Sequence, residues 1–117
     1  MIFNRLTREE LRDWSAREIM CFHTKSSNPE GYYFNPDGSI YGKVRNWQPD
    51  WEHDGQWLDV MERLLNRGAE IIIRPHMAPI NHHVSIFLGS RWSEASDRSL
   101  PLAFLHAAYT AVQRLSS

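Results

Sequence analysis

The spacing of apolar and polar residues near the N-terminus predicts a helix that begins at Thr7. Thr7 and Glu10 have the spacing of a capping box, in which each side chain accepts a hydrogen bond from the other residue's backbone N–H. Leu6 and Leu11 flank this box as a hydrophobic staple. Four apolar positions then fall near one face of the helix: Leu11, Trp14, Ile19 and Phe22. The helix should end before residues 26–31, whose Ser, Asn, Pro and Gly favour turns.

Two short aromatic segments predict a β-hairpin after this helix. Residues 32–34 and 39–41 flank a turn sequence that contains Pro36 and Gly38. Pro36 presets the first turn dihedral, and Gly38 accepts a positive φ. We therefore expect two antiparallel strands joined by a tight turn.

A second helical period starts near residue 54. Four apolar residues recur at helical spacing: Trp57, Met61, Leu64 and Leu65. Asp54 has the position and the chemistry of an N-cap, and Gly68 stands where a left-handed C-terminal cap is favoured. A third helix is predicted from about residue 100 to residue 115, again with apolar residues on one face.

The segments 69–74 and 83–88 predict an antiparallel pair of strands. Each contains three consecutive apolar residues, so both faces of the pair carry apolar side chains. We therefore predict a single α+β domain over residues 1–117, an α-β-α sandwich in which a small antiparallel sheet is covered by helices on both faces. Helices one and three should pack on one face and helix two on the other. Truncation of Ile72 or Phe87 should then open a core cavity.

Two motifs around these elements resemble a known family. The first runs from Trp47, Pro49 and Asp50 into Gln56, Trp57, Val60, Glu62, Arg63 and Leu64, and the second comprises Asp97, Pro101, Leu102, Ala103, Ala107 and Ala108. Over roughly residues 46–115 the chain resembles the phage ABA sandwich domain, a family of small proteins encoded by bacteriophages and prophages. The resemblance implies an α-β-α sandwich. It implies no activity, because the family carries no agreed catalytic residues.

Composition and charge narrow the possible function classes. Among 117 residues, 13 Lys and Arg nearly balance 14 Asp and Glu, so no overall positive field favours non-specific nucleic-acid binding. The single cysteine, Cys21, cannot form an internal disulfide, no secretion leader is recognisable, and the apolar runs are too short to span a bilayer. We therefore expect a cytoplasmic protein that contacts neither membrane nor nucleic acid directly, and the resemblance to the phage family implies that the cytoplasm is that of a bacterial host.

The sequence carries no local signature of a catalytic or nucleotide-binding site. It lacks Gly-x-Gly-x-x-Gly and Walker-type loops, the Gly-x-Ser-x-Gly elbow and the His-Glu-x-x-His helix. His76, His82 and His83 lie in or beside one connection and could converge on a transition metal, although solvated imidazoles are the more common outcome. We expect no enzyme activity, no cofactor and no stoichiometric metal. A small-ligand or metal-binding protein or enzyme that uses this connection is the alternative.

The acidic, tryptophan-bearing segment 46–54 is the predicted partner-binding loop. The hypothesis assigns binding to Trp47, Asp50, Trp51, Glu52 and Asp54. An aromatic anchor ringed by carboxylates suits a partner with a basic surface. The alternatives are local packing of the Trp rings and helix capping by the Asp residues.

These observations lead to a functional hypothesis. We expect a small non-enzymatic phage or prophage protein that inhibits a host protein by occupying its surface. Host defence proteins that handle nucleic acid, CRISPR effectors among them, have basic channels that fit such an inhibitor. A structural or accessory phage component is the alternative, and the oligomeric state is left open. Trp51→Ala should weaken binding, and charge reversal at Asp50 and Glu52 should weaken it more at low salt than at high salt.

Overall fold

The computed structural model of the chain describes residues 6–24, 31–52, 55–75 and 81–116. The elements follow one another as α1 (Arg8–Trp14), the π-helix η1 (Ser15–Ile19), β1 (Tyr32–Phe34), β2 (Ile40–Lys43), the short 3-10 helix η2 (Val44–Asn46), α2 (Gln56–Asn66), β3 (Glu70–Pro75), β4 (His82–Leu88), β5 (Arg91–Asp97) and α3 (Leu100–Ser116). Strands β1 and β2 form an antiparallel hairpin, and β3, β4 and β5 form a second antiparallel sheet in that order. The predicted α+β class is confirmed.

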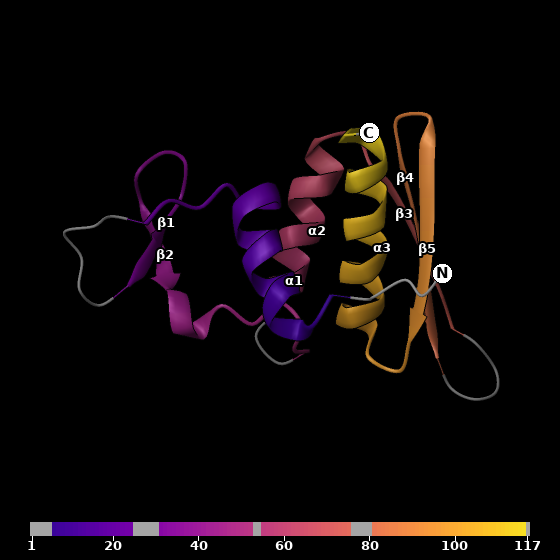
Figure 1. Cartoon of the computed structure of the whole chain (residues 1–117), viewed down its shortest axis with the longest axis horizontal. Helices are drawn as coiled ribbons and strands as arrows, with labels where there is room; N and C mark the ends of the chain where they lie inside the picture. The colour runs from indigo at the N-terminus through magenta and orange to yellow at the C-terminus, as the bar shows by residue number, and fades with distance from the viewer. Residues whose placement is uncertain (1–5, 25–30, 53–54, 76–80, 117) are drawn as a thin grey trace.

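The elements are stacked in layers along the long axis of the molecule (Figure 1). The three-stranded sheet lies at one end, α3 packs against it, α1 and α2 lie beyond α3, and the β1–β2 hairpin lies at the opposite end. All three α-helices of the described residues therefore lie on the same side of the sheet. The prediction that helices cover both faces, with helix two opposite helices one and three, is wrong.

Alternation along β4 explains this difference. Ile86 is fully buried, whereas its neighbour Phe87 is 37% exposed. Ser93, which pairs with Ile86, donates a hydrogen bond from its hydroxyl to the Ala107 carbonyl of α3 at 2.5 Å. The face that carries Ile86 and Ser93 is therefore the inner face, which packs on α3. The consecutive apolar run includes one residue on the outer face and does not indicate that both faces are covered.

The sequence does not predict β5, because its Ser, Glu and Asp residues are poor strand formers. The strand exists because its backbone pairs with β4 along its whole length, from Asp97 opposite His82 to Arg91 opposite Leu88. Trp92 lies on this strand. Its ring stacks on Phe87 across the pair, with centroids 6.2 Å apart.

Short-range signals in the sequence are confirmed at several positions. The Thr7 hydroxyl accepts a hydrogen bond from the Glu10 backbone N–H at 3.1 Å, and the Thr7 N–H donates to Glu10 Oε1 at 2.9 Å. The predicted hairpin forms between β1 and β2. Gly38 and Gly68 adopt the positive φ angles that their places in a turn and at the end of α2 require, 91° and 93°.

The start of α2 differs from the prediction. The N-cap position is held by Gly55, at φ 66°, and Asp54, the predicted cap, lies outside the described residues. Gln56, the first residue of α2, instead holds the segment around residues 46–48 at the start of the helix through its side-chain amide. Its Oε1 accepts from the Gln48 backbone N–H at 2.6 Å, and its Nε2 donates to the Asn46 carbonyl at 3.0 Å.

Aromatic rings attach the β1–β2 hairpin to the rest of the molecule. The ring of Phe22 stacks on that of Tyr33, with centroids 4.9 Å apart. Its centroid lies 4.6 Å from that of Tyr41 and 5.1 Å from that of Trp47. The Tyr41 hydroxyl donates a hydrogen bond to Asp59 Oδ2 of α2 at 2.5 Å. Burial of the phenol and, after it, this hydrogen bond raise the pKa of Tyr41.

The raised pKa of Tyr41 predicts a loss of stability in alkaline solution. The neutral phenol stabilises the fold below the unfolded-state pKa of about 10, and this contribution is lost as the pH rises above that value. The free energy of unfolding, measured by urea titration, should therefore fall between about pH 9 and about pH 11. Tyr41→Phe should reduce this fall. An identical pH dependence in Tyr41→Phe and in wild type would contradict this role for Tyr41.

Candidate functional site

Trp47, a predicted partner-binding residue, lies in the core. It is 3% exposed. Its Nε1 donates hydrogen bonds to the Arg12 carbonyl at 2.9 Å and to Ser15 Oγ at 3.2 Å, so its polar atom is satisfied within the fold. Trp47 therefore packs locally, and the hypothesis that it presents an exposed ring to a partner is wrong.

Asp50, a second predicted residue, is also buried, at 1% exposure. Arg12 donates two hydrogen bonds to it, from Nε to Oδ1 at 2.7 Å and from Nη2 to Oδ2 at 3.0 Å, and Arg8 Nη1 lies 3.4 Å from Oδ2. The hydrogen bond to Asp50 raises the pKa of Arg12. Asp50 therefore attaches its loop to α1, and it is not a surface charge that a partner could contact.

The other predicted residues of this loop are placed differently. Trp51 is 44% exposed, and Glu52 is exposed as well. Asp54 lies outside the described residues. Trp51 and Glu52 are accessible to a partner, and their role in binding stays a prediction.

Trp47 also affects the helix beside it. Regular α-helix ends at Trp14, and η1 continues as a π-helix in which the Met20 N–H donates to the Ser15 carbonyl at 2.9 Å. A side chain that bonds to a helix carbonyl, as Trp47 does at Arg12, is a recognised cause of such a break in the hydrogen-bond ladder. Because π-helical turns are frequent at functional sites, the surface of α1 and η1 is a candidate site.

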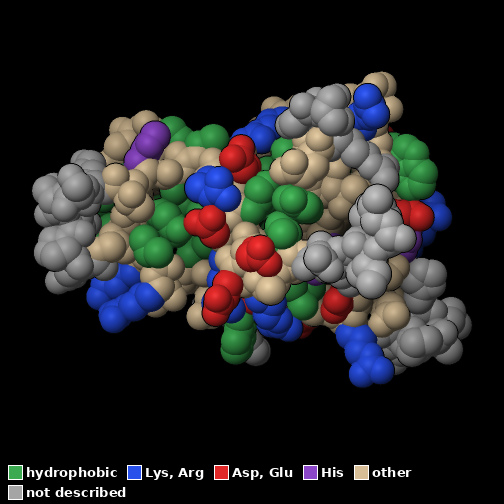
Figure 2. Space-filling view, viewed as in Figure 1, with side chains coloured by type: hydrophobic (Ala, Val, Ile, Leu, Met, Phe, Trp, Pro, Cys, Tyr) green, Lys and Arg blue, Asp and Glu red, His purple; other side chains and the backbone are tan. Residues whose placement is uncertain are grey.

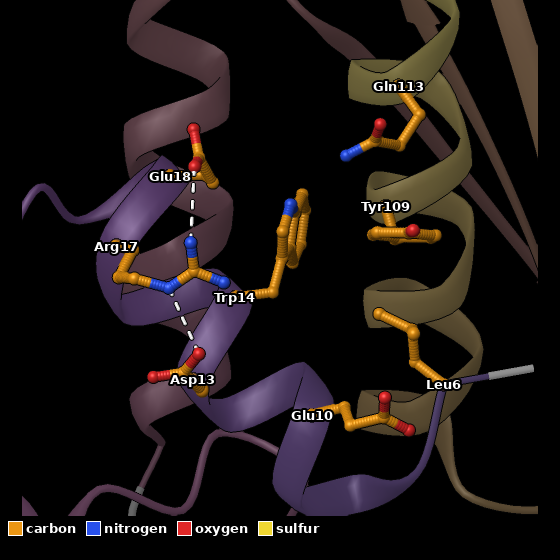
Figure 3. A pocket seen from close by; sticks show the side chains of 8 residues that line it. All are labelled: Leu6, Glu10, Asp13, Trp14, Arg17, Glu18, Tyr109 and Gln113. Carbon is orange, nitrogen blue, oxygen red and sulfur yellow. Dashed lines mark hydrogen bonds and ion pairs between the residues drawn. The ribbon is translucent and has the colours of Figure 1, made fainter.

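A groove with a volume of about 290 Å³ separates this helical surface from α3 (Figure 3). The indole ring of Trp14 lies between the two walls, so we name it the Trp14 groove. Its lining comprises Glu10, Asp13, Trp14, Arg17 and Glu18 from α1 and η1, Tyr109 and Gln113 from α3, and Leu6 at one end.

Trp14 carries an unsatisfied polar atom in this groove. The residue is 4% exposed and packs edge-on against Tyr109, with ring centroids 5.2 Å apart and an interplanar angle of 83°. Its Nε1 is buried and has no hydrogen-bond acceptor among the described residues. Figure 3 shows this nitrogen on the side of the ring toward Glu18 and Gln113. An unpaired buried donor is costly, so an acceptor placed at this nitrogen would stabilise the site.

The rim of the Trp14 groove is acidic. Arg17 Nε lies 3.0 Å from Asp13 Oδ2, and Arg17 Nη1 lies 3.6 Å from Glu18 Oε1. All three side chains are at least 53% exposed, so these ion pairs are weak and can rearrange at little cost. Glu10 adds a third carboxylate, against one arginine among the described residues of the lining. Acidic side chains lie over the middle of the molecule with Lys and Arg side chains among them (Figure 2), so the acidic character belongs to the lining of the groove. The groove therefore favours a cationic ligand.

The outer face of the sheet is a second exposed surface. Phe87 and Trp92, which stack on each other, are 37% and 48% exposed. On the same face, His83 Nε2 lies 2.9 Å from Glu94 Oε2, and its Nδ1 lies 2.7 Å from Ser96 Oγ. An exposed aromatic pair bordered by polar groups is typical of a surface that contacts another protein.

The predicted histidine site is only partly covered by the structure. His76 lies outside the described residues, whereas His82 and His83 are half-buried at the start of β4. Among the residues that the structure describes, no group of three His, Cys, Asp or Glu side chains is placed to hold a metal ion. The expected absence of a metal stays a prediction. Within the same residues, no helix has both the length and the apolar character needed to cross a membrane.

The sequence contains one local pattern that could have indicated the Trp14 groove, and the hypothesis of a binding loop at residues 46–54 did not use it. Glu10, Asp13, Trp14, Arg17 and Glu18 recur at i, i+3, i+4, i+7 and i+8, which places them near one helix face. A charged face with a single tryptophan in it indicates a possible binding surface. The second wall of the groove comes from α3, at the other end of the chain, and spacing alone cannot identify it.

Comparison with known proteins adds information on the fold. No protein-family model matches the chain, and no curated protein sequence matches it. The fold is similar to that of a phage protein from Bacillus cereus ATCC 14579 with a 2.0 Å crystal structure, with a TM-score of 0.66 and 14% sequence identity over 97% of this chain and 94% of that chain. At this identity the likeness shows a shared fold and nothing more. Membership of the phage ABA sandwich family stays a prediction from the sequence motifs.

Proposed function

We propose that this chain is a non-enzymatic, phage- or prophage-encoded binding protein that holds a basic segment of a host protein in the Trp14 groove. The observation that carries this proposal is the combination of three rim carboxylates with a buried indole N–H that has no acceptor among the described residues. A ligand with a cationic group and an acceptor atom matches both features. Proteins with basic surfaces supply such segments.

The choice of a host defence protein as partner rests on physical complementarity and on the fold. The chain shares its fold with a phage protein, and its motifs resemble a phage family. Host proteins that bind nucleic acid, CRISPR effectors among them, have basic channels, and an acidic groove can bind a basic segment at the edge of such a channel. A protein bound there would block the channel and inhibit the host protein without any reaction.

The composition of the groove supports a binding role over catalysis. Among the described residues that line it there is no Ser, Cys, Lys or His, residue types that often serve as nucleophile or general base. Its acidic side chains are exposed to solvent and are not enclosed in an apolar pocket of the kind that acid–base catalysis uses. The observed geometry therefore favours recognition.

The exposed Phe87–Trp92 pair favours a second candidate function. Aromatic rings on an open sheet face are typical anchors for protein contact, so this face could join the chain to other phage components. In that case the protein would be a structural or accessory component of the phage. Trp92→Ala distinguishes this candidate, because it alters the outer face and leaves the groove intact.

The proposed function is tested by affinity capture from a bacterial host lysate with identification by mass spectrometry. The groove variant Asp13→Lys with Glu18→Lys should retain host proteins at least about tenfold less than wild type, because reversed rim charges repel a basic partner. The matched control, Glu62→Lys with Glu70→Lys, makes the same charge change at exposed sites on α2 and β3 and should retain them. Raising the salt concentration should weaken wild-type capture.

Two outcomes of this capture experiment would contradict the proposal. Undiminished capture by the groove variant would place the interface elsewhere, on the outer face if Trp92→Ala abolishes capture, or on the loop if Trp51→Ala does. Equal losses in the groove variant and in the charge-matched control would show that overall charge, and not the groove, governs capture. Circular dichroism of each variant establishes that the fold is retained.

A further inference from the structure

We infer that the Trp14 groove binds a single arginine residue of the partner protein, with the guanidinium among the rim carboxylates and a neighbouring main-chain carbonyl accepting the hydrogen bond of Trp14 Nε1. This inference rests on the proposed function and adds the chemical identity of the bound group. Three features of the groove support it: the unpaired indole donor, the size of the cavity and the arrangement of the acidic side chains.

The indole donor requires an acceptor that reaches a nearly buried position. Trp14 is 4% exposed, and its Nε1 has no acceptor among the described residues. A main-chain carbonyl of an inserted peptide segment supplies a strong acceptor at the end of a short, uncharged group. A bare cation offers only donors and would leave the indole N–H unpaired.

The size of the groove limits what enters it. Its volume of about 290 Å³ is at the lower bound of the roughly 300–1,000 Å³ typical of sites for drug-sized ligands. One long side chain with its adjoining peptide group fits such a volume, whereas a folded surface or a helix does not. Leu6, Trp14 and Tyr109 provide apolar and aromatic contacts along which the aliphatic stem of an arginine can pack.

The arrangement of charge favours arginine over lysine. The groove presents separate carboxylates, those of Glu10, Asp13 and Glu18, and a planar guanidinium with five N–H donors can bond to more than one of them at a time. Arg17 of the chain already donates a hydrogen bond to Asp13 and forms an ion pair with Glu18. Because these contacts are solvent-exposed, an incoming guanidinium can share or displace them at little cost.

The test is a titration of the full chain with acetylated, amidated Gly-Gly-X-Gly-Gly peptides, followed by the Trp14 indole N–H signal in proton–nitrogen NMR spectra. With X as arginine, this signal should shift downfield as the hydrogen bond forms, and the Trp92 signal should not move. Lysine should bind several-fold more weakly, and citrulline, which is neutral and nearly isosteric with arginine, at least about tenfold more weakly. Butylguanidinium, a cation without a carbonyl, should leave the Trp14 signal in place.

Variants separate the groove from the rest of the surface. The triple variant Glu10→Gln, Asp13→Asn, Glu18→Gln should weaken arginine-peptide binding at least about tenfold. Glutamine at position 10 still supports the capping box with Thr7, so the helix start is preserved. The control Glu62→Gln with Glu70→Gln removes charge outside the groove and should bind the peptide as wild type does.

Several results would overturn the inference. A Trp14 signal unmoved by the arginine peptide up to about 10 mM would exclude even weak binding. Equal responses to arginine and citrulline would show that charge is not recognised, and equal responses to arginine and lysine would remove the preference for the guanidinium. If capture of host proteins depends on the groove while these peptides fail, the inference is wrong and the proposed function stands. If the peptides bind while capture ignores the groove, the proposed function is wrong.

Discussion

Arg12→Ala is expected to destabilise the fold by about 3 kcal/mol, because it leaves a buried carboxylate without its main partner. The Asp50 side chain is 0% exposed, and Arg12 provides its two shortest hydrogen bonds. Arg8 would remain, but its Nη1 lies 3.4 Å from Oδ2 and its side chain is 52% exposed. The loss should be visible as a lower midpoint in urea unfolding followed by circular dichroism.

A control and a rescue test this explanation. Arg17→Ala removes an arginine whose ion pairs are solvent-exposed and should cost less than about 1 kcal/mol. Arg12→Met combined with Asp50→Leu removes both charges and should recover part of the loss, because no uncompensated charge stays buried. If Arg12→Ala costs no more than Arg17→Ala, the Arg12–Asp50 pair does not hold the loop to α1.

The second large effect is expected at Phe104 in α3. Phe104 is fully buried, and its ring lies 6.1 Å from that of Trp57 on α2, so Phe104→Ala should open a cavity between helices and cost about 3–5 kcal/mol. Phe87→Ala removes the same side chain from the outer face, where it is 37% exposed, and should cost less than half as much. Equal losses would show that the outer face is covered after all.

Local features of the helix ends were predicted from the sequence, because the residues that interact there lie close together along the chain. The capping box at Thr7 and Glu10 and the glycine at the end of α2 belong to this class. The pairing of β3 with β4 was also predictable, since both strands carry apolar residues that a sheet can bury.

Features that depend on distant residues were not predictable in the same way. Trp47 and Asp50 stand in a polar, acidic segment, and the sequence does not show that Arg12 and Ser15 satisfy their polar atoms. The missed β5 has a similar cause: Ser93 suits the strand because it bonds to the Ala107 carbonyl of α3. In each case a tertiary contact decides the outcome against local composition.

The candidate site could be predicted only in part, for the same reason. One wall of the Trp14 groove is a recognisable helix face, but the sequence does not show that the indole N–H of Trp14 has no acceptor among the described residues, which depends on how α1, η1 and α3 come together. A helical pattern with an inward tryptophan ordinarily indicates core packing, which Trp14 also provides. Its second role becomes visible only when the acceptors around the ring are examined in three dimensions.

The most direct test of the central claim uses the five tryptophans of the chain as reporters of where a partner binds. Each indole N–H gives its own signal in a proton–nitrogen NMR spectrum, and Trp14 and Trp92 lie in the groove and on the outer face of the sheet respectively. On addition of the purified host protein identified by capture, we expect the Trp14 signal to shift and the Trp92 signal to keep its position. A shift of the Trp92 signal with the Trp14 signal unmoved would contradict the proposal that the Trp14 groove is the binding site.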